Sequence, residues 1–328
     1  MKKSFVPRLG REISQVGLGC WQLGADWGDV DEDRSQEILH AAADAGTTFF
    51  DTADAYGDGR SEASIGTFLK DRDNSSEIVV ATKMGRRADP HVASAYTLDN
   101  FRRWTDRSRE NLGVDTLDLV QLHCPPSEVM HRPQTFDDLR TLVQEGRMRH
   151  WGVSVETSQD AQDVLGEHDV ATVQIVLNVF RRKPLERVTV QAAEAGVGII
   201  ARVPLASGLL SGKYDEHTTF PDNDHRTFNR SGAAFDVGET FAGVPFDVGV
   251  QAARKVAALT PEGWTTAQLA LAWIASQSVA TMIPGARTPE QARGNAAVGS
   301  FPQIDDETLA ELAAIYNSDI RQHVHSRW

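Results

Sequence analysis

The sequence predicts an α/β protein of the (β/α)8 class, a TIM barrel with a long loop after the seventh strand and an extra C-terminal helix. Strand and helix signals alternate through most of the 328 residues, which is typical of βαβ units and a parallel sheet. The predicted strands are apolar runs rich in β-branched and aromatic residues, as buried parallel strands are. We expect one barrel domain spanning residues 1–328, because barrels of this class commonly reach this length.

The first half of the chain carries four strand signals and four helix signals. Ser61 is the expected N-cap of the second helix, and glycines follow the other three helices. The expected strands cover residues 14–19, 47–50, 77–82 and 117–122. The expected helices cover residues 31–45, 61–69, 98–112 and 135–145.

The second half repeats this alternation and completes the barrel. Its expected strands cover residues 149–155, 172–177, 197–203 and 279–283. Its expected helices cover residues 158–165, 184–195, 265–276 and 289–297, with the extra helix at 305–316. The alternative is an open doubly wound sheet, which is disfavoured because GLGCWQLG lacks the G-x-G-x-x-G spacing of a dinucleotide-binding turn.

One stretch, residues 211–245, interrupts the alternation. It has no sustained period and contains many Gly, Asp, Asn and Thr residues. Inserts of this length without regular structure are usually functional lids, and this one follows the seventh strand. We expect a lid over the carboxyl ends of the strands; the alternative is a tolerated surface excursion.

Composition narrows the class of protein. The net charge of −13 disfavours nonspecific nucleic-acid binding, which relies on a basic surface. No apolar run approaches the ~18 residues of a membrane span, and the first residues lack the apolar region of a secretory signal. With only Cys20 and Cys124, a disulfide framework is not expected. We therefore expect a cytoplasmic protein with no nucleic-acid or membrane partner.

Four polar residues, Asp51, Tyr56, Lys83 and His123, follow or end three consecutive strands. In a βα barrel these strand ends lie on one face, where catalytic residues collect. Taken alone, each could be an ordinary rim or turn residue. Their joint placement on consecutive strands favours a catalytic site.

The chemistry of the four residues points to protonation of a substrate oxygen. A phenol titrates near pKa ~10, and the ammonium of Lys83 is expected to lower the pKa of Tyr56, with Asp51 holding Lys83. His123 is expected to orient the substrate oxygen. None of the four can deliver hydride, so a redox cofactor is implied.

The motifs DTADAYG, ATKMG, LVQLHCP, GVSVE and IPGARTPEQARGN resemble, in this order, those of the aldo-keto reductases. The resemblance covers nearly the whole chain and implies carbonyl reduction with a nicotinamide cofactor. It also implies a catalytic tetrad of Asp51, Tyr56, Lys83 and His123, with Tyr56 as the general acid.

The resemblance further implies a cofactor path along the barrel. Ser154 and Gln174 would hold the nicotinamide carboxamide, although Val155 stands where many relatives have Asn. Arg202 stands where relatives often stack an aromatic ring on the nicotinamide, and a planar guanidinium can stack too. The remaining implied contacts are Leu205, Ser207, Gly208 and Lys213 for the pyrophosphate, and Gly285, Ala286, Arg287, Gln291 and Asn295 for the adenosine.

Arg287 could pair with a 2′-phosphate, which favours NADP(H). NAD(H) stays open, because many relatives have Arg at the position of Gln291. Trp21 resembles the aromatic pocket wall of the family, and His323, His325 and Trp328 could enter the pocket from the C-terminal tail. No metal site is expected, because the two histidines lack a carboxylate or Cys at ligand spacing.

Two other functions are alternatives to a carbonyl reductase that acts on a small-molecule substrate. Some relatives, such as the potassium-channel β subunits, act as cofactor-binding regulatory subunits with slow turnover. A metal-dependent barrel hydrolase would need ligands such as His-x-His near the first strand, and His is absent before residue 40. The sequence does not name the substrate, the reaction direction or the oligomeric state.

Overall fold

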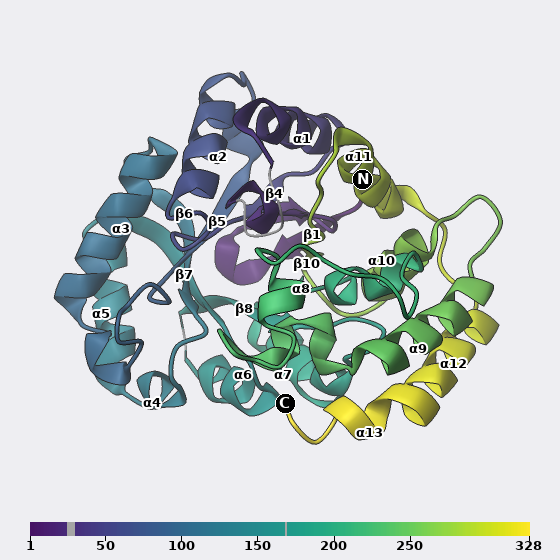
Figure 1. Cartoon of the computed structure of the whole chain (residues 1–328). Helices are drawn as coiled ribbons and strands as arrows, with labels where there is room; N and C mark the ends of the chain where they lie inside the picture. The colour runs from purple at the N-terminus through teal and green to yellow at the C-terminus, as the bar shows by residue number, and fades with distance from the viewer. Residues whose placement is uncertain (25–29, 168) are drawn as a thin grey trace.

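The computed structural model describes residues 1–24, 30–167 and 169–328. Within these residues, eight parallel strands form one sheet in the order β3 to β10 (Figure 1). The strands are β3 (Leu18–Gly19), β4 (Phe49–Asp51), β5 (Val79–Met84), β6 (Leu117–His123), β7 (Met148–Ser154), β8 (Val170–Val176), β9 (Gly198–Arg202) and β10 (Thr281–Met282). The predicted fold class is confirmed.

The sheet closes into a barrel between its first and last strands. Val16 pairs with Met282, and Gly19 with Gly285, both in parallel. The backbone N–H of Gly17 donates to the Met282 carbonyl at 2.8 Å. A Cβ at Gly17 would lie 2.9 Å from the Phe49 carbonyl oxygen, so this close strand approach requires glycine.

Helices surround the barrel on its outside (Figure 1). The helices between and after the strands are α1 (Glu32–Asp44), α2 (Arg60–Lys70), α3 (Leu98–Leu112), α4 (Ser127–Met130), α5 (Pro133–Gln144), α6 (Ser158–Leu165), α7 (Val188–Ala195), α10 (Thr266–Ala275) and α11 (Pro289–Ala297). The bounds of α6 and α11 match the predicted ranges. No helix in the described ranges is long and apolar enough to cross a membrane.

An antiparallel hairpin, β1 (Lys3–Val6) and β2 (Arg11–Ser14), was not predicted. Val6 and Ile13 of the hairpin pack with residues near the beginnings of the strands, including Phe49 and Val79. The hairpin therefore fills the amino-terminal end of the barrel and leaves the carboxyl ends of the strands for the site.

The expected N-cap at Ser61 is wrong. Helix α2 begins at Arg60 after Gly59, whose φ of 92° suits glycine. The Ser61 hydroxyl instead donates to the Cys20 carbonyl at 2.8 Å and accepts from Thr52 at 2.8 Å. Ser61 thus ties the start of α2 to the strand ends on either side of the site.

The segment from 211 to 245, called the lid below, is more ordered than predicted. It contains α8 (His225–Phe228) and short 3-10 turns at Val237–Glu239 and Phe241–Gly243. It crosses in front of the strands in Figure 1. Two helices follow it that were not predicted as such: α9 (Phe246–Ala258), and α13 (Arg321–Val324) beyond the expected extra helix α12 (Asp306–Ile315).

Candidate active site

The four predicted catalytic residues lie together at the carboxyl ends of β4, β5 and β6. The Lys83 ammonium is fully buried and donates to Asp51 Oδ1 at 2.5 Å and to Tyr56 Oη at 3.2 Å. The His123 ring stands perpendicular to the Tyr56 ring, with centroids 5.8 Å apart. A phenol hydroxyl, an ammonium and an imidazole therefore lie together at these strand ends.

Two glycines hold Tyr56 at this point. Gly57 adopts a φ of 59°, which turns the chain directly after Tyr56. A Cβ at Gly24 would lie 2.6 Å from the backbone carbon of Tyr56. The turn carrying Tyr56 therefore packs backbone to backbone against Gly24, and a side chain at either glycine would displace it.

A hydrogen-bond chain links this centre to two more strands. Gln174 Nε2 donates to Asp51 Oδ2 at 2.7 Å, and Ser154 Oγ donates to Gln174 Oε1 at 3.3 Å. Gln121 Nε2 also donates to Asp51 Oδ2, at 3.3 Å. Sequence reasoning missed Gln121, although its place two residues before His123 on the same strand could have indicated it.

Burial and charge set the protonation states. Burial lowers the pKa of Lys83, but Asp51 and Tyr56 outweigh it, and the pKa is raised. Burial raises the pKa of Tyr56 to about 12 against the opposing charge of Lys83, so the expected net lowering is wrong. Burial and the nearby Arg86 hold the pKa of His123 well below its usual value. Near neutral pH the site thus has a charged Lys83, a protonated Tyr56 and a neutral His123.

A cavity of about 530 Å³ opens beside these residues. Asp51, Tyr56 and His123 line one part of it, while Lys83 lies behind them and is not in the lining. The predicted cofactor contacts that line it are Ser154, Gln174, Arg202, Leu205, Ser207, Gly208, Lys213, Gly285, Arg287, Gln291 and Asn295. The structure thus brings these predicted residues into one cavity.

The turn after β9 has an unusual backbone. Ala206, Ser207 and Gly208 follow one another with φ values of 48°, 53° and 93°. Successive turns of this kind can form concave backbone sites that bind anions. Ser207 Oγ accepts from the backbone N–H of Phe241 at 3.0 Å, so the lid fixes the turn.

Arg287 and Glu290 line the far end of the cavity, at the start of α11. The backbone N–H of Arg287 donates to Gln291 Oε1 at 2.8 Å, and Asn295 Nδ2 donates to the Gly285 carbonyl at 3.2 Å. Sequence reasoning missed Arg226, a lid residue that also lines the cavity. Its place in an irregular segment gave no signal in the sequence.

Arg202 is held by polar partners rather than lying free. Its Nη2 donates to the Val155 carbonyl at 3.0 Å and to Glu156 Oε2 at 2.8 Å. Glu239 of the lid lies 3.6 Å from Arg202 Nη1 and 3.1 Å from Arg86 Nη1. Sequence reasoning missed Arg86 and Glu156, although each lies two residues after the end of a strand, on the face where the predicted catalytic residues lie.

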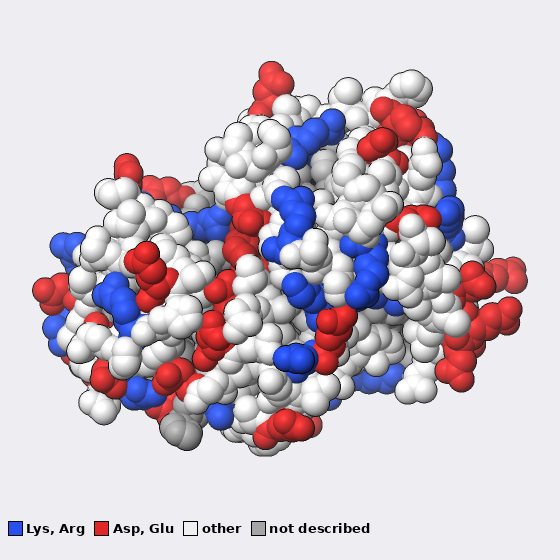
Figure 2. Space-filling view, turned by 90° about the horizontal axis from the view of Figure 1, so that it is seen from below, with Lys and Arg blue, Asp and Glu red and all other residues white. Residues whose placement is uncertain are grey.

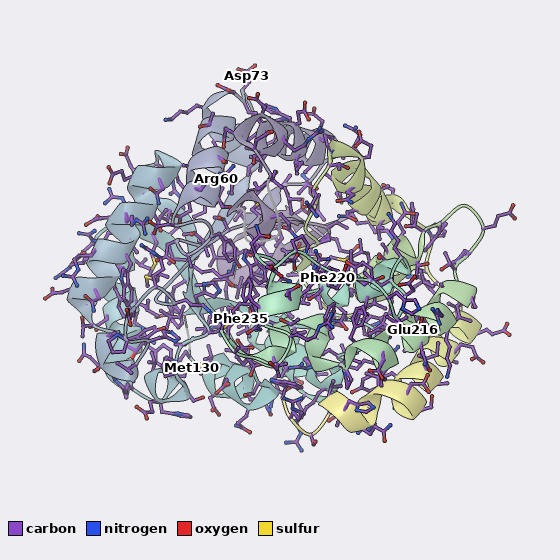
Figure 3. All side chains as sticks on the ribbon, in the orientation of Figure 1. Arg60, Asp73, Met130, Glu216, Phe220 and Phe235 are labelled. Carbon is purple, nitrogen blue, oxygen red and sulfur yellow. The ribbon has the colours of Figure 1, made fainter. Side chains whose placement is uncertain are left out.

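The predicted pocket wall Trp21 faces Tyr56, with ring centroids 5.8 Å apart and planes 18° from parallel. The ring of lid residue Phe235 packs edge-on against Trp21, with centroids 5.9 Å apart, and Figure 3 labels Phe235 on the segment in front of the strands. Trp21 thus forms a wall between the reacting centre and the lid.

The suggestion that the C-terminal tail enters the pocket is wrong for Trp328 and His325. Trp328 Nε1 donates to Asp236 Oδ1 at 2.9 Å, and its ring lies 3.8 Å from the Arg181 guanidinium. His325 faces Glu186 at 3.0 Å, outside the cavity. The C-terminal tail therefore packs against the lid outside the cavity.

Comparison with known proteins gives likenesses over nearly the whole chain. A model of the aldo/keto reductase family matches residues 15–317. An aldo-keto reductase of Schizosaccharomyces pombe, whose name includes the cofactor NADP(+), is 28% identical over 315 residues. The match covers 93% of this chain and 89% of the relative.

Solved structures agree with this match. A glycerol dehydrogenase from Gluconobacter oxydans is 27% identical with a TM-score of 0.78, covering 98% of this chain and 96% of that chain. An aldo-keto reductase from Klebsiella pneumoniae, solved with NADPH, is 25% identical with a TM-score of 0.69, covering 96% of each chain.

Proposed function

Because the chain belongs to the aldo/keto reductase family of NAD(P)H-dependent oxidoreductases, we propose that it reduces aldehyde or ketone carbonyls with NADPH. The observation that carries the proposal is the buried contact of Lys83 with both Asp51 and Tyr56 at the edge of the cavity. It presents a phenol that can donate a proton beside an ammonium that stabilises the resulting phenolate.

The nicotinamide, when bound, supplies a hydride to the carbonyl carbon. Tyr56 Oη gives its proton to the carbonyl oxygen as the electron pair of the C=O bond moves onto that oxygen. Lys83 favours the phenolate that remains, because it lies 3.2 Å from Tyr56 Oη. Neutral His123 donates a hydrogen bond that orients the oxygen. The product is an alcohol, and Tyr56 regains its proton from solvent.

We propose that the cavity binds a dinucleotide with an added phosphate, that the turn at Ser207 and Gly208 holds the pyrophosphate, and that Arg287 and Lys213 meet the anionic groups. These two cations line the cavity of a chain with net charge −13, so they mark a local site for an anion. Arg226 also lines the cavity, but its guanidinium is already paired with Asp224. NADP-bound and NADP-named relatives support the choice of NADP over NAD.

We also infer that the chain works as one barrel domain in the cytoplasm on a small-molecule substrate. Both cysteines are buried free thiols, which suits a reducing compartment. On the face in Figure 2, acidic and basic side chains are interspersed rather than gathered into one basic patch.

Two measurements test the proposal. Titration with NADPH should quench the fluorescence of a protein with 7 Trp residues, and NADPH consumption should follow addition of some members of a panel of aldehydes and ketones. Absence of saturable NADPH binding would refute the cofactor assignment. Tight binding with turnover slower than about 1 per minute on every carbonyl would favour the alternative, a cofactor-binding regulatory subunit; typical enzymes turn over at about 1–1,000 per second.

A further inference from the structure

We propose that Glu156, acting through Arg202, sets how strongly the site prefers NADPH over NADP+ and thereby how readily the oxidised cofactor is released. The inference rests on the proposed function, because it concerns the nicotinamide end of the same cavity. Glu156 is a positioning residue in this account. It contributes charge beside the cofactor and is not part of the cavity lining.

The Arg202 guanidinium lies next to the reacting centre. It bonds to the carbonyl of Val155, which follows Ser154, at 3.0 Å, and to the sulfur of Cys124, which follows His123, at 3.7 Å. Its charge contributes to the lowered pKa of His123, after burial, Arg86 and Lys83. A nicotinamide placed to give hydride to a carbonyl beside Tyr56 and His123 must feel the same charge.

Glu156 and Glu239 together face the two positive charges of Arg86 and Arg202. Arg202 pairs with Glu156 at 2.8 Å and with Glu239 at 3.6 Å, and Arg86 pairs with Glu239 at 3.1 Å and with Glu156 at 3.8 Å. A carboxyl oxygen of Glu156 and one of Glu239 also lie within 4.8 Å of each other. Two buried carboxyls this close disfavour each other's ionised form, which favours the retention of one proton by the pair. With that proton the cluster has a net charge of +1, and without it the net charge is zero.

Glu156 is the better placed of the two carboxyls to retain that proton, because fewer cations oppose its burial. Burial raises the pKa of Glu156, with Glu239 and Asp236 adding to the rise and Arg202 opposing it. Arg86 and Arg202 instead hold the pKa of Glu239 below its usual value in spite of burial. The groups that face Glu156 come from the β5 and β9 ends, the lid and, at Cys124, the β6 end. The ionisation of Glu156 is therefore shifted toward neutral pH.

The two forms of the cofactor differ in charge only at the nicotinamide. The oxidised ring is a cation, so a cluster of charge +1 disfavours NADP+ relative to NADPH. Ionisation of Glu156 removes that excess charge and strengthens NADP+ binding more than NADPH binding. The site therefore releases NADP+ more readily while Glu156 is protonated, and loses that bias once Glu156 ionises.

The test is the ratio of the dissociation constants of NADP+ and NADPH, measured by fluorescence titration of the whole protein from pH 6 to pH 8. Titration of the 2′-phosphate cancels in this ratio, because both cofactors carry the group. We expect the ratio for the wild type to fall about tenfold across this range as Glu156 ionises. In Glu156→Gln, which stays neutral, the ratio should remain high and independent of pH.

Glu290→Gln is the matched control. Glu290 lines the adenosine end, which the two cofactors share, so this variant should keep the wild-type pH profile of the ratio. A wild-type ratio that does not change with pH would overturn the inference. This measurement does not depend on whether any variant folds. A pH-dependent ratio that survives in Glu156→Gln would overturn the role of Glu156. Failure of both cofactors to bind would instead contradict the proposed function.

Discussion

Lys83 is a fully buried ammonium whose charge is kept by its neighbours. Burial alone would favour the neutral amine, but a carboxylate at 2.5 Å and a phenol oxygen at 3.2 Å raise the pKa of Lys83 instead. The same ammonium opposes, without cancelling, the effect of burial on Tyr56. The phenol therefore stays protonated until a substrate oxygen needs the proton, which is the state that a general acid requires.

Part of the site was predictable residue by residue. Asp51, Lys83 and His123 could be placed together because parallel strand ends share one face of a barrel. The bond from Gln174 to Asp51 could not be predicted, since it joins strands whose residues lie far apart in sequence. The rise in the pKa of Tyr56 was missed because burial within the barrel outweighs the opposing charge of Lys83, and the charge of Asp51 adds to the rise.

Replacing Arg287 with Ala should lower kcat/KM for NADPH by about ten- to a hundredfold and change the value for NADH little. The physical reason is the loss of a charge-assisted hydrogen bond to the 2′-phosphate, which NADH lacks. Steady-state kinetics with both cofactors checks this. Arg293→Ala is the control, because Arg293 lies on α11, the helix that follows Arg287, but does not line the cavity. An equal loss with NADPH and NADH would assign Arg287 a different role.

At the scale of elements, the lid is held by the C-terminal tail and by Arg181 as well as by the barrel strands. Trp328 bonds Asp236, and a Cβ at Gly243 would lie 2.5 Å from the Trp328 ring. Arg181 Nη1 donates to the Ala242 carbonyl at 2.9 Å. Because Glu239 lies between Asp236 and Ala242, these contacts fix the carboxylate that meets Arg86 and Arg202.

Trp328→Ala should loosen the lid. Truncation of a buried Trp commonly costs about 3–5 kcal/mol, and here the cost falls on the contact with residues 236–243. We expect faster protease cleavage within 211–245 and a higher KM for NADPH. Phe5→Ala, which truncates an aromatic residue that is 61% exposed on β1, serves as the control. Unchanged cleavage in the Trp328 variant would show that the tail does not hold the lid.

Sequence patterns predicted elements well where period and caps agreed. The range 158–165 follows Thr157, whose side chain caps the Asp160 N–H, and the range 289–297 follows the similar cap Thr288. The hairpin of β1 and β2 was missed because its strands are four residues each, too short for an alternating pattern to stand out. The order in the lid was missed because it comes from contacts with Arg181 and Trp328.

For the whole molecule, buried acids make stability depend on pH. Asp54 is 1% exposed, and neither of its carboxyl oxygens has a hydrogen-bond partner among the described residues. Burial and the charge of Glu62 raise its pKa to about 8. The folded state therefore keeps a proton that the unfolded chain, with pKa ~3.9, releases. The contribution of Asp54 to the free energy of unfolding is therefore complete below about pH 4 and falls as the pH rises to about 8.

Asp54→Asn should remove this pH dependence. Relative to the wild type, the variant should gain up to about 1.4 kcal/mol of unfolding free energy per pH unit between about pH 4 and 8, and the gain should then level off. Denaturant unfolding at several pH values measures the difference. Asp73→Asn, at the exposed position labelled at the edge of Figure 3, should show no such slope. A gain that does not depend on pH would contradict the account.

The central claim is that Tyr56 gives the proton in a carbonyl reduction powered by NADPH. Its most direct test is the single-turnover rate of Tyr56→Phe with saturating NADPH and the best carbonyl substrate of the panel. Removing the general acid should slow this rate by about a hundred- to ten-thousandfold and leave the dissociation constant of NADPH unchanged. A variant that reduces the carbonyl at the wild-type rate would contradict the account.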